Sequence, residues 1–308
     1  MQFSTQEPAD LSLARQTKLM YKNNLNNTVF LIAVLFISII TACTLKPIPS
    51  TYKAARTATI HFLDVGQGDS TLFSLPSGEI ILVDAGDSSA GLKVTGYLKD
   101  LGISRIDHLI FTHLHDDHIG GIFMVMKEFD VINIYDNGFS NPDSYIYKDY
   151  FSLIDNSPSI YNILRTGTSL TFGEVSIEVL NPRAQPTGNH NRDSIVMKVN
   201  YGNISVLMAG DMETVGERDL LKRSHGLSSQ ILKVSHHGDR DSTSDEFLKR
   251  LQPEIAIISV GEGNKYARPH QEVLDRLNRT GARVYRTDIN GAIILKTDGN
   301  EYSLQTER

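Results

Sequence analysis

Apolar residues along this chain follow two different periods, which predict strands in some segments and helices in others. The run from His108 to Thr112 is apolar, β-branched and of strand length. Downstream of it, apolar side chains recur at helical spacing, at Ile119, Ile122, Phe123, Met126 and Phe129. We therefore expect a loop that is held between a packed strand and a packed helix, which is the rigid support that a functional site needs.

The same two patterns continue along the chain. Helical patterns cover Gly91 to Leu101 and Gln271 to Arg279. Strand-like runs from Ser194 to Val199 and from Asn203 to Met208 flank Tyr201-Gly202 and predict a hairpin. This mixture predicts two packed sheets with helices on the outside.

The chain can bury a large core, because it has 308 residues and 40% of them are hydrophobic. That length allows one large domain or two small ones. We expect one folded domain at 59–308, since the candidate site residues are spread from His113 to His237 and must converge.

The N-terminus carries a separate signal. Val29 to Ala42 is an unbroken run of apolar and small residues, preceded by Lys18 and Lys22. Its fourteen residues, at about 1.5 Å each, are too few to cross a hydrocarbon core of about 30 Å. They suit the apolar region of a signal peptide.

The segment Ile40-Thr41-Ala42-Cys43 resembles a bacterial lipobox, in which the cysteine is lipidated. Cys43 is the only cysteine of the chain, so no internal disulfide can form and acylation is the expected use of its thiol. We expect a signal peptide at 1–43 and a tether at 44–58, which hold an extracytoplasmic lipoprotein at the cell membrane. The alternative is an uncleaved N-terminal membrane anchor.

Residues 112–121 read Thr-His-Leu-His-Asp-Asp-His-Ile-Gly-Gly and carry the most chemistry in the chain. Three histidines and two aspartates fall within six positions at the end of the predicted strand. His113 and His115, two apart in an extended segment, point to the same side and can offer nitrogens to one cation. Asp117 and His118 begin the next turn and can reach a second cation. The sequence therefore predicts a metal site in this loop.

His-x-His-x-Asp-His after a strand resembles the signature of the metallo-β-lactamase fold. Further segments fit that family in order: Ile80 to Gly86, Met208 to Asp211, and Lys233 to Gly238. More narrowly, His61 to Asp69, the His-His-Gly segment and Tyr285 to Gly291 are similar to the C-terminal metallo-hydrolase domain of ComEC-type competence proteins. The resemblance implies the α/β class and an αββα sandwich of two mixed β-sheets flanked by helices.

The resemblance also implies two divalent cations, whose ligands are His113 and His115 for one, Asp117 and His118 for the other, and Asp211 for both. One of His236 and His237 completes the second set, because side chains alternate along a strand and only one of the two can face the cations. The sequence does not decide between them. Two cations about 3.5–4 Å apart can hold a hydroxide and polarise a phosphoryl or carbonyl oxygen, so Asp117 is also a candidate catalytic residue.

One departure from the family pattern adds a second metal to those that the site could bind. Many members place a further histidine ligand where this chain reads Asn189-His190-Asn191-Arg192-Asp193-Ser194. Asn191 and Ser194 match the ComEC-like pattern and are candidate catalytic residues, while His190 is an alternative ligand. A site with one imidazole fewer suits manganese as well as zinc. We expect zinc, with manganese as the alternative.

A histidine at the start of a predicted helix is a further catalytic candidate. His270 follows Pro269, and ComEC-like domains have a matching histidine there. It could protonate a leaving oxygen or bind an anion, and Lys265 and Arg268 add positive charge nearby. The alternative is an ordinary surface histidine.

Three polar residues lie in a glycine-containing turn after a predicted strand, at Asp64, Gln67 and Asp69. We expect them to orient ligand imidazoles from behind or to serve the turn alone. Asp84 ends another apolar run, and we expect it to be structural rather than a ligand.

We expect an extracytoplasmic metal-dependent hydrolase, with cleavage of DNA by a phosphodiesterase or nuclease as the favoured activity, since the resemblance is to a domain of a DNA-uptake protein. The formal charge of −6 argues against a strong general grip on polyanions. The alternatives are hydrolysis of a small phosphodiester, a phosphocholine ester, a lactam or a lactone, and a non-catalytic binding module. The sequence lacks membrane channel segments, so we expect a free-standing domain. It does not reveal which protein partner, if any, the domain has.

Overall fold

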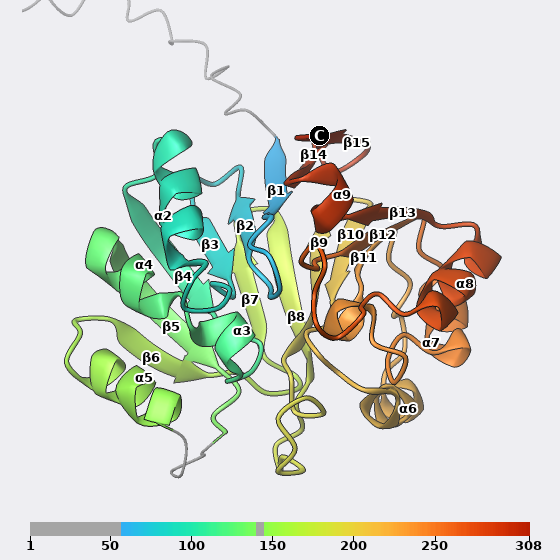
Figure 1. Ribbon diagram of the computed structural model, residues 1–308, viewed down its shortest axis with the longest axis horizontal. Coiled ribbons are helices and arrows are strands. Elements are labelled where there is room, and N and C mark those ends of the chain that lie inside the picture. The colour runs from blue at the N-terminus through green and yellow to red at the C-terminus, as the bar shows by residue number, and fades with distance from the viewer. Residues whose placement is uncertain (1–56, 140–144) are drawn as a thin grey trace, which may run out of the picture. The chain divides into compact units, whose positions relative to one another are not determined.

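Two β-sheets pack face to face and carry helices on their outer sides in the computed structural model of the chain (Figure 1). The structure describes residues 57–139 and 145–308. The expected signal peptide at 1–43 lies outside the described residues, as does the tether at 44–58 apart from its last two positions. Within the described ranges, no helix has both the length and the apolar character needed to cross a membrane.

The first sheet has eight strands, and its two halves pair differently. In sheet order the strands are β15 (Tyr302–Thr306), β14 (Ile293–Thr297), β1 (Ala58–Phe62), β2 (Thr71–Ser74), β3 (Ile80–Val83), β4 (Arg105–Ile110), β5 (Asp130–Asp136) and β6 (Ile160–Ile163). Neighbours from β15 to β3 are antiparallel, and neighbours from β3 to β6 are parallel. Parallel neighbours need crossover connections, which here are helices on the outer face.

The second sheet has seven strands and is also mixed. In sheet order they are β13 (Arg283–Arg286), β12 (Ile255–Ile258), β11 (Ile231–Lys233), β10 (Ile204–Met208), β9 (Val196–Tyr201), β8 (Val175–Asn181) and β7 (Ser169–Phe172). Neighbours from β13 to β10 are parallel, and those from β10 to β7 are antiparallel. The hairpin predicted around Tyr201-Gly202 is the β9–β10 pair, in which Tyr201 lies opposite Ile204.

Among the described residues, three longer helices cover each sheet (Figure 1). On the first sheet lie α2 (Gly91–Asp100), α4 (Ile122–Glu128) and α5 (Tyr145–Asp155), and on the second lie α6 (Thr214–Arg223), α7 (Asp245–Leu251) and α8 (Gln271–Thr280). Three shorter pieces follow strands, namely α3 (Asp116–Ile119), η1 (Ser235–Gly238) and α9 (Thr287–Asn290). This arrangement confirms the αββα sandwich of two mixed sheets.

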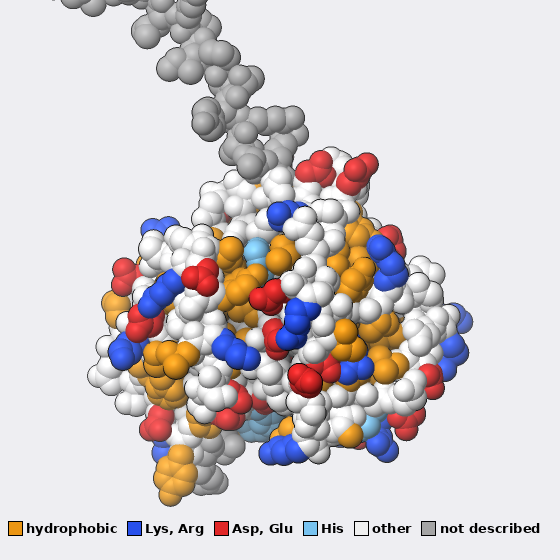
Figure 2. Space-filling view, turned by 45° about the horizontal axis from the view of Figure 1, so that its top comes forward, with side chains coloured by type: hydrophobic (Ala, Val, Ile, Leu, Met, Phe, Trp, Pro, Cys, Tyr) orange, Lys and Arg blue, Asp and Glu red, His pale blue; other side chains and the backbone are white. Residues whose placement is uncertain are grey.

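The surface carries acidic and basic side chains in a mixed pattern. Figure 2 shows lysine and arginine side chains interspersed with aspartate and glutamate side chains over the face that it displays. The whole chain has a formal charge of −6. If a polyanion binds to that face, it must bind at a local cluster of positive charge, because the described residues of the face form no broad basic surface.

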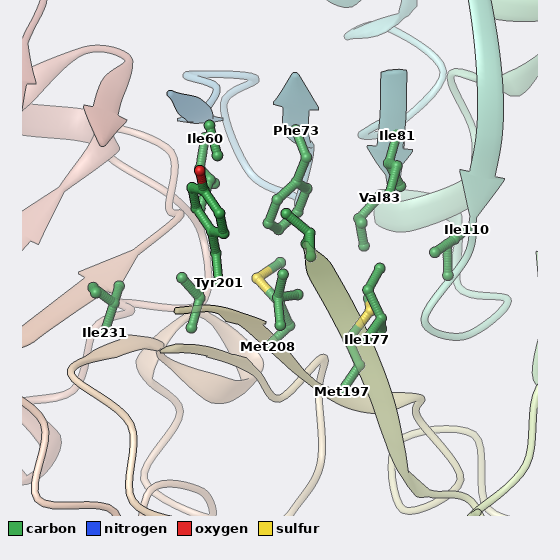
Figure 3. Close-up of a cluster of buried hydrophobic side chains, with 14 of the residues drawn as sticks. Ile60, Phe73, Ile81, Val83, Ile110, Ile177, Met197, Tyr201, Met208 and Ile231 are labelled. Atoms are coloured by element: carbon green, nitrogen blue, oxygen red, sulfur yellow. The ribbon is translucent and has the colours of Figure 1, made fainter. Parts of the chain in front are cut away.

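Side chains alternate along the strands and so fill separate cores on the two sides of each sheet. Figure 3 shows the core between the sheets, where side chains of the first sheet approach those of the second, including Ile60, Phe73, Val83, Ile177, Met197 and Met208. On β12, Ile255 and Ile257 enter this core, whereas Ala256 and Ile258 pack toward the helices. Burial of both faces explains why this strand reads as a continuous apolar run.

Two glycines divide the helical pattern predicted at 119–129 into α3 and α4. Gly120 and Gly121 separate the two helices. A Cβ atom on Gly121 would come within 2.1 Å of the Ala85 carbonyl oxygen, and the Gly121 nitrogen donates to the Gly86 carbonyl at 3.1 Å. The start of α4 therefore packs directly on the backbone of the loop after β3, which fixes the neighbouring histidine loop.

Candidate metal centre

The candidate ligands meet in the loops that follow β4, β10 and β11. Thr112 fixes the first of these loops, because its backbone nitrogen and its hydroxyl donate to the two carboxylate oxygens of buried Asp84, both at 2.8 Å. His115 then caps the first turn of α3 with an extended backbone. As a result, His113 Nε2 and His115 Nδ1 lie 2.9 Å apart.

Asp211 lies at the centre of the cluster. Donor atoms within 4.8 Å of one another come in one set from His113, His115 and Asp211, and in a second set from Asp117, His118, Asp211 and His237. The structure thus brings together six of the predicted ligand residues and places Asp211 in both sets. His236 belongs to neither set.

A sharp turn after β10 delivers Asp211 to this position. Gly210 has a φ of +52°, and a Cβ atom there would meet the Cβ atoms of Ser194 and Thr112 at 2.9 and 3.2 Å. A side chain therefore does not fit at Gly210. The Asp211 backbone nitrogen donates to Ser194 Oγ at 3.2 Å, so Ser194, a predicted catalytic residue, contacts the backbone of the shared carboxylate.

Hydrogen bonds behind two ligand rings orient them. His118 Nδ1 lies 2.9 Å from Asp84 Oδ2, and His237 Nδ1 lies 3.0 Å from the Ser259 carbonyl oxygen. Because a carbonyl oxygen only accepts, we assign a proton to His237 Nδ1, and the same assignment at His118 satisfies Asp84. The Nε2 atoms then face the cluster, which is the arrangement that metal binding requires.

In the second set of donor atoms, the distances fit a bound cation better than hydrogen bonds. His118 Nε2, His237 Nε2 and Asp211 Oδ1 are buried and have no hydrogen-bond partner among the described residues. His118 Nε2 lies 3.4 Å from Asp211 Oδ1, and His237 Nε2 lies 3.3 Å from Asp117 Oδ2. Two ligands at about 2.1 Å from a tetrahedral ion lie about 3.4 Å apart, whereas hydrogen bonds are roughly 2.7–3.2 Å long. The cluster can therefore bind metal ions.

The charges of the cluster also favour a cation. Burial by itself raises the pKa of Asp211, but the imidazoles of His118 and His237 outweigh burial and hold that pKa well below its usual range. Burial lowers the pKa of His118, but the carboxylates of Asp211 and Asp84 outweigh it and raise the pKa well above its usual value. Carboxylates that draw protons onto neighbouring imidazoles attract a divalent cation for the same reason.

The backbone at His236 and His237 is not the predicted strand. Both residues are left-handed, with φ values of 52° and 55° inside η1. The expectation that strand alternation selects one of them was therefore wrong in its premise. His236 Nε2 lies 2.9 Å from Arg268 Nη2 and 3.6 Å from Asp211 Oδ2. Left-handed residues other than glycine cost about 1–2 kcal/mol each and gather at functional sites.

The loop before β9 lies beside His115. The His190 ring stacks on the His115 ring with centroids 4.9 Å apart, and it also packs against Phe139. His190 is in neither set of donor atoms. Asn191 Nδ2 donates to Glu213 Oε1 at 3.3 Å, while its Oδ1 is buried without a hydrogen-bond partner in the described part of the chain.

A second group of polar residues lies next to η1. His270 caps the start of α8, and its Nδ1 accepts a hydrogen bond from the Arg240 backbone nitrogen at 3.0 Å. A ring that accepts at Nδ1 carries its proton on Nε2. Arg268 donates from Nε to Asp239 Oδ2 at 2.9 Å and, through its contact with His236, links this group to the cluster.

Comparison with known proteins decides the family. Residues 63–262 match the Metallo-beta-lactamase superfamily. This chain belongs to the metallo-β-lactamase superfamily. The superfamily consists of metal-dependent hydrolases, and the cluster supplies the donor atoms that such an enzyme needs.

Named relatives place the chain more narrowly within the superfamily. It is 34% identical over 253 residues to ComE operon protein 3 of Bacillus subtilis, over 76% of this chain and 32% of the relative. The resemblance to ComEC-type competence proteins is thereby confirmed, and the matched part spans about a third of that relative's length. The chain is also 26% identical over 160 residues to Exodeoxyribonuclease YycJ of Bacillus anthracis, over 49% of this chain and 58% of the relative.

A solved structure agrees on the fold. The metallo-beta-lactamase fold protein YhfI from Bacillus subtilis matches with a TM-score of 0.53 and 14% sequence identity, over 78% of this chain and 100% of YhfI. At this identity the likeness shows the metallo-β-lactamase fold alone.

Two of the three polar residues that could have oriented ligand rings have other partners in this member of the superfamily. Asp64 accepts from the Gly66 nitrogen at 3.3 Å and pairs with Arg308 Nη2 at 2.9 Å. Gln67 Oε1 accepts from the Gly261 nitrogen at 3.4 Å. Asp64 therefore takes part in its own turn and also pairs with Arg308, whereas Gln67 contacts the loop after β12, so neither residue serves the turn alone.

Lys233 is a buried partner of the site that was not predicted from the sequence. Its side chain is 1% exposed, and Nζ donates to Asp69 Oδ2 at 2.8 Å. Asp69 Oδ1 lies 3.3 Å from His237 Nδ1, so Asp69 does reach a ligand ring. Burial raises the pKa of Asp69, but Lys233 and His237 outweigh it and hold the pKa below its usual range. A lysine inside an apolar strand is the signal that could have revealed this pair.

Proposed function

We propose that this protein is a phosphodiesterase that cleaves DNA outside the cytoplasm with the help of two divalent cations. The observation that carries the proposal is Asp211, a carboxylate shared by two sets of metal-binding side chains. Paired cations are typical of enzymes that cleave phosphodiesters. We assign one cation to His113, His115 and Asp211, and the other to Asp117, His118, Asp211 and His237. Nitrogen and carboxylate donors suit zinc, which we expect, and also manganese.

When bound, the cations would polarise a phosphoryl oxygen and neutralise charge on the leaving oxygen. The protein keeps the donor atoms in place, because Ser194 holds the backbone of Asp211 and Asp84 orients a ligand ring. Asn191 has a buried side-chain oxygen without a hydrogen-bond partner among the described residues. We assign to this oxygen the orientation of the attacking water.

His270 acts as a hydrogen-bond donor in this proposal. Its Nδ1 accepts from the Arg240 backbone nitrogen, so a second proton on the ring would break that bond. A neutral ring with its proton on Nε2 can donate to a phosphoryl oxygen, and it keeps that proton throughout the reaction. This favours the anion-binding alternative for His270 over the general-acid alternative.

Arg268 and His236 complete the surroundings of the phosphate. The Arg268 guanidinium lies between His236 and Asp239, and a guanidinium is well suited to bind phosphate oxygens in pairs. His236 Nε2 lies 3.6 Å from Asp211 Oδ2. We therefore assign both residues to substrate binding rather than to ligation of the cations.

DNA is the proposed substrate because one relative carries the name exodeoxyribonuclease and another belongs to the competence proteins. DNA transport is not part of the proposal, since the matched part covers 32% of ComE operon protein 3. We also propose that a lipid on Cys43 holds the enzyme at the membrane, with an uncleaved anchor as the alternative. Cys43 lies outside the described residues.

The proposal is tested by reconstituting purified protein with zinc or manganese and assaying a panel of substrates. The panel holds single-stranded DNA, duplex DNA, RNA, bis(p-nitrophenyl) phosphate and a β-lactam. We expect metal-dependent cleavage of DNA and of the aryl phosphodiester, and its loss in Asp211→Asn but not in the control Asp155→Asn, which changes an exposed aspartate. Turnover of the β-lactam above that of every phosphodiester would overturn the assignment.

A further inference from the structure

A basic cleft lies between α6 and the loop that joins β8 to β9. It has a volume of about 390 Å³, and its charged lining consists of Arg183, Arg192, Arg218, Lys222, Asp193 and Asp219. Four positive side chains thus face two negative ones, which leaves two net positive charges in a chain whose formal charge is −6. The charged lining is therefore net positive, and one of its cations, Arg192, also pairs with Glu213, with Nε 3.5 Å from Oε2.

The two acidic side chains are already engaged within the protein. Asp193 accepts hydrogen bonds from the backbone nitrogens of Thr187 and Gly188 at 2.9 and 2.8 Å. Asp219 Oδ2 lies 3.3 Å from Arg183 Nε. These carboxylates shape the cleft and hold its loop in place, so they compete little for the remaining cations.

Arg218 and Lys222 are the cations that remain available. They lie four residues apart on α6, which places them on one face of the helix. Both are exposed, and neither has a carboxylate partner among the described residues. α6 has 10 residues and is therefore about 15 Å long. The cleft thus presents a short row of unpaired positive charges.

Both walls of the cleft lead to the metal centre. On one side, α6 begins at Thr214, directly after the turn that carries Asp211. On the other side, the loop ends at Ser194, whose Oγ contacts the Asp211 backbone. Asn181, at the end of β8, holds the loop by donating to the carbonyls of Arg192 and Ser194 at 2.8 and 2.7 Å, and Arg223 of α6 donates to Asn181 Oδ1 at 2.6 Å. A chain bound in the cleft would therefore lie beside the cluster.

We propose that this cleft binds the sugar–phosphate backbone of a nucleic acid strand whose scissile bond lies at the metal centre. The inference rests on the proposed function and specifies its substrate as a polynucleotide rather than a small phosphodiester. Arg218 and Lys222 lie four residues apart on α6, about 6 Å along the helix axis, which at about 3.4 Å per nucleotide matches about two nucleotides of a stacked strand in addition to the two that flank the scissile bond. A small phosphodiester bound at the cluster would not extend along α6.

The first experiment measures binding without catalysis. A fluorescein-labelled single-stranded DNA 12-mer is titrated with the full chain in chelator, over a range of salt concentrations, and anisotropy is recorded. The double variant Arg218→Ala/Lys222→Ala should bind about tenfold more weakly, and its plot of log K against log salt should be shallower by about 1.4, since each lost phosphate contact removes about 0.7.

The matched control is Lys93→Ala/Lys127→Ala, which removes two exposed lysines from α2 and α4 on the other sheet. It should bind the 12-mer like the wild type. Equal affinity and salt dependence in the cleft variant and the wild type would overturn the proposal, as would equal competition by polyglutamate, which carries charge without a sugar–phosphate backbone. Competition by RNA equal to that by DNA would support a backbone site.

The second experiment separates this inference from the proposed function. The metal-loaded enzyme is assayed on DNA of two to twelve nucleotides and on bis(p-nitrophenyl) phosphate. In the wild type, kcat/KM should rise with length to about four nucleotides, and the cleft variant should lose at least tenfold more on the 12-mer than on the aryl ester. If no phosphodiester is cleaved, the proposed function fails, while the binding experiment still tests the cleft. A flat length dependence in an active enzyme overturns the cleft alone.

Discussion

The orientation of the histidine rings at this site is set by the groups that they contact on the side away from the cluster. His118 and His237 turn Nδ1 toward Asp84 and Ser259, and His270 turns Nδ1 toward a backbone nitrogen. In each case the partner decides which ring nitrogen is available to the site. The chemistry assigned to a residue therefore depends on a neighbour that never meets the substrate.

His270→Ala distinguishes a hydrogen-bond donor from a general acid. A donor to a phosphoryl oxygen is needed whether or not the leaving group needs a proton, so turnover should fall by about 10²-fold on both DNA and bis(p-nitrophenyl) phosphate. His225→Ala, at an exposed histidine, is the control and should leave both rates unchanged. A large loss on DNA with none on the nitrophenyl ester would restore the general-acid role.

Lys233→Met should be strongly destabilising, because it leaves the Asp69 carboxylate buried without its cation. Loss of one partner from a buried pair costs about 3–5 kcal/mol of unfolding free energy. Lys99→Met, which breaks a solvent-exposed pair with Glu128, should change the free energy of unfolding far less, because water screens an exposed ion pair. Urea denaturation at neutral pH measures both, and equal costs would contradict the buried role.

The contribution of the Lys233–Asp69 pair to the free energy of unfolding also depends on pH. Because the pKa of Asp69 is lowered in the folded state, its contribution to stability is present above the unfolded pKa of about 3.9 and is lost as the pH falls below it. The difference in unfolding free energy between wild type and Lys233→Met should therefore shrink in acid.

At the scale of elements, the helices and strands could be predicted from the sequence, whereas the irregular turns could not. Periodicity predicted a helix at Gly91 to Leu101, and α2 covers Gly91–Asp100. The turn at His236 and His237 was missed because a left-handed backbone at non-glycine residues leaves no periodic pattern. The partner of Lys233 lies 164 residues away in the chain, and the basic cleft forms only where two distant elements meet. Such contacts depend on tertiary packing.

Gly121→Ala tests the backbone contact that fixes the histidine loop. The added Cβ atom would lie 2.1 Å from the Ala85 carbonyl oxygen, so the loop after β3 must shift, at a cost of about 1–3 kcal/mol in unfolding free energy. Gly96→Ala is the matched control, since Gly96 lies inside α2 and a Cβ atom there would have no neighbour within 4 Å. It should stabilise by about 0.5–1 kcal/mol. Thermal denaturation of both variants gives the comparison, and a neutral Gly121→Ala would contradict the close contact.

At the scale of the whole molecule, the metal centre joins the two sheets. His113 follows β4 of the first sheet, whereas Asp211 and His237 follow β10 and β11 of the second. Sequence could predict this convergence only through the family resemblance, because spacing along the chain does not tell which strand ends meet. Bound cations would therefore contribute to the stability of the whole sandwich as well as to catalysis.

Metal removal should accordingly lower both activity and stability. A cation that binds the folded protein at a concentration 100 times its Kd stabilises it by about 2.7 kcal/mol. We expect chelator to abolish phosphodiesterase activity and to lower Tm by several degrees, and zinc or manganese to restore both. In Asp211→Asn, added metal should change Tm little. If chelator leaves the Tm of the wild type unchanged, the prediction of a bound cation is contradicted.

Cys43→Ala tests the proposed attachment to the membrane. If the cysteine is lipidated, the variant should either leave the membrane fraction or accumulate as an uncleaved precursor of larger mass. Fractionation and intact mass measurement in a bacterial host distinguish these outcomes from the uncleaved anchor, for which both fraction and mass stay unchanged.

Because the ligands belong to loops almost a hundred positions apart on two different sheets, the site comes into being only after both sheets have formed and packed. Metal binding at this site would therefore require the packed sandwich. A chain that crosses the membrane unfolded, as the proposed signal peptide implies, would acquire its cations on the far side. The metal it carries would then reflect the supply of that compartment rather than that of the cytoplasm in which the chain was made.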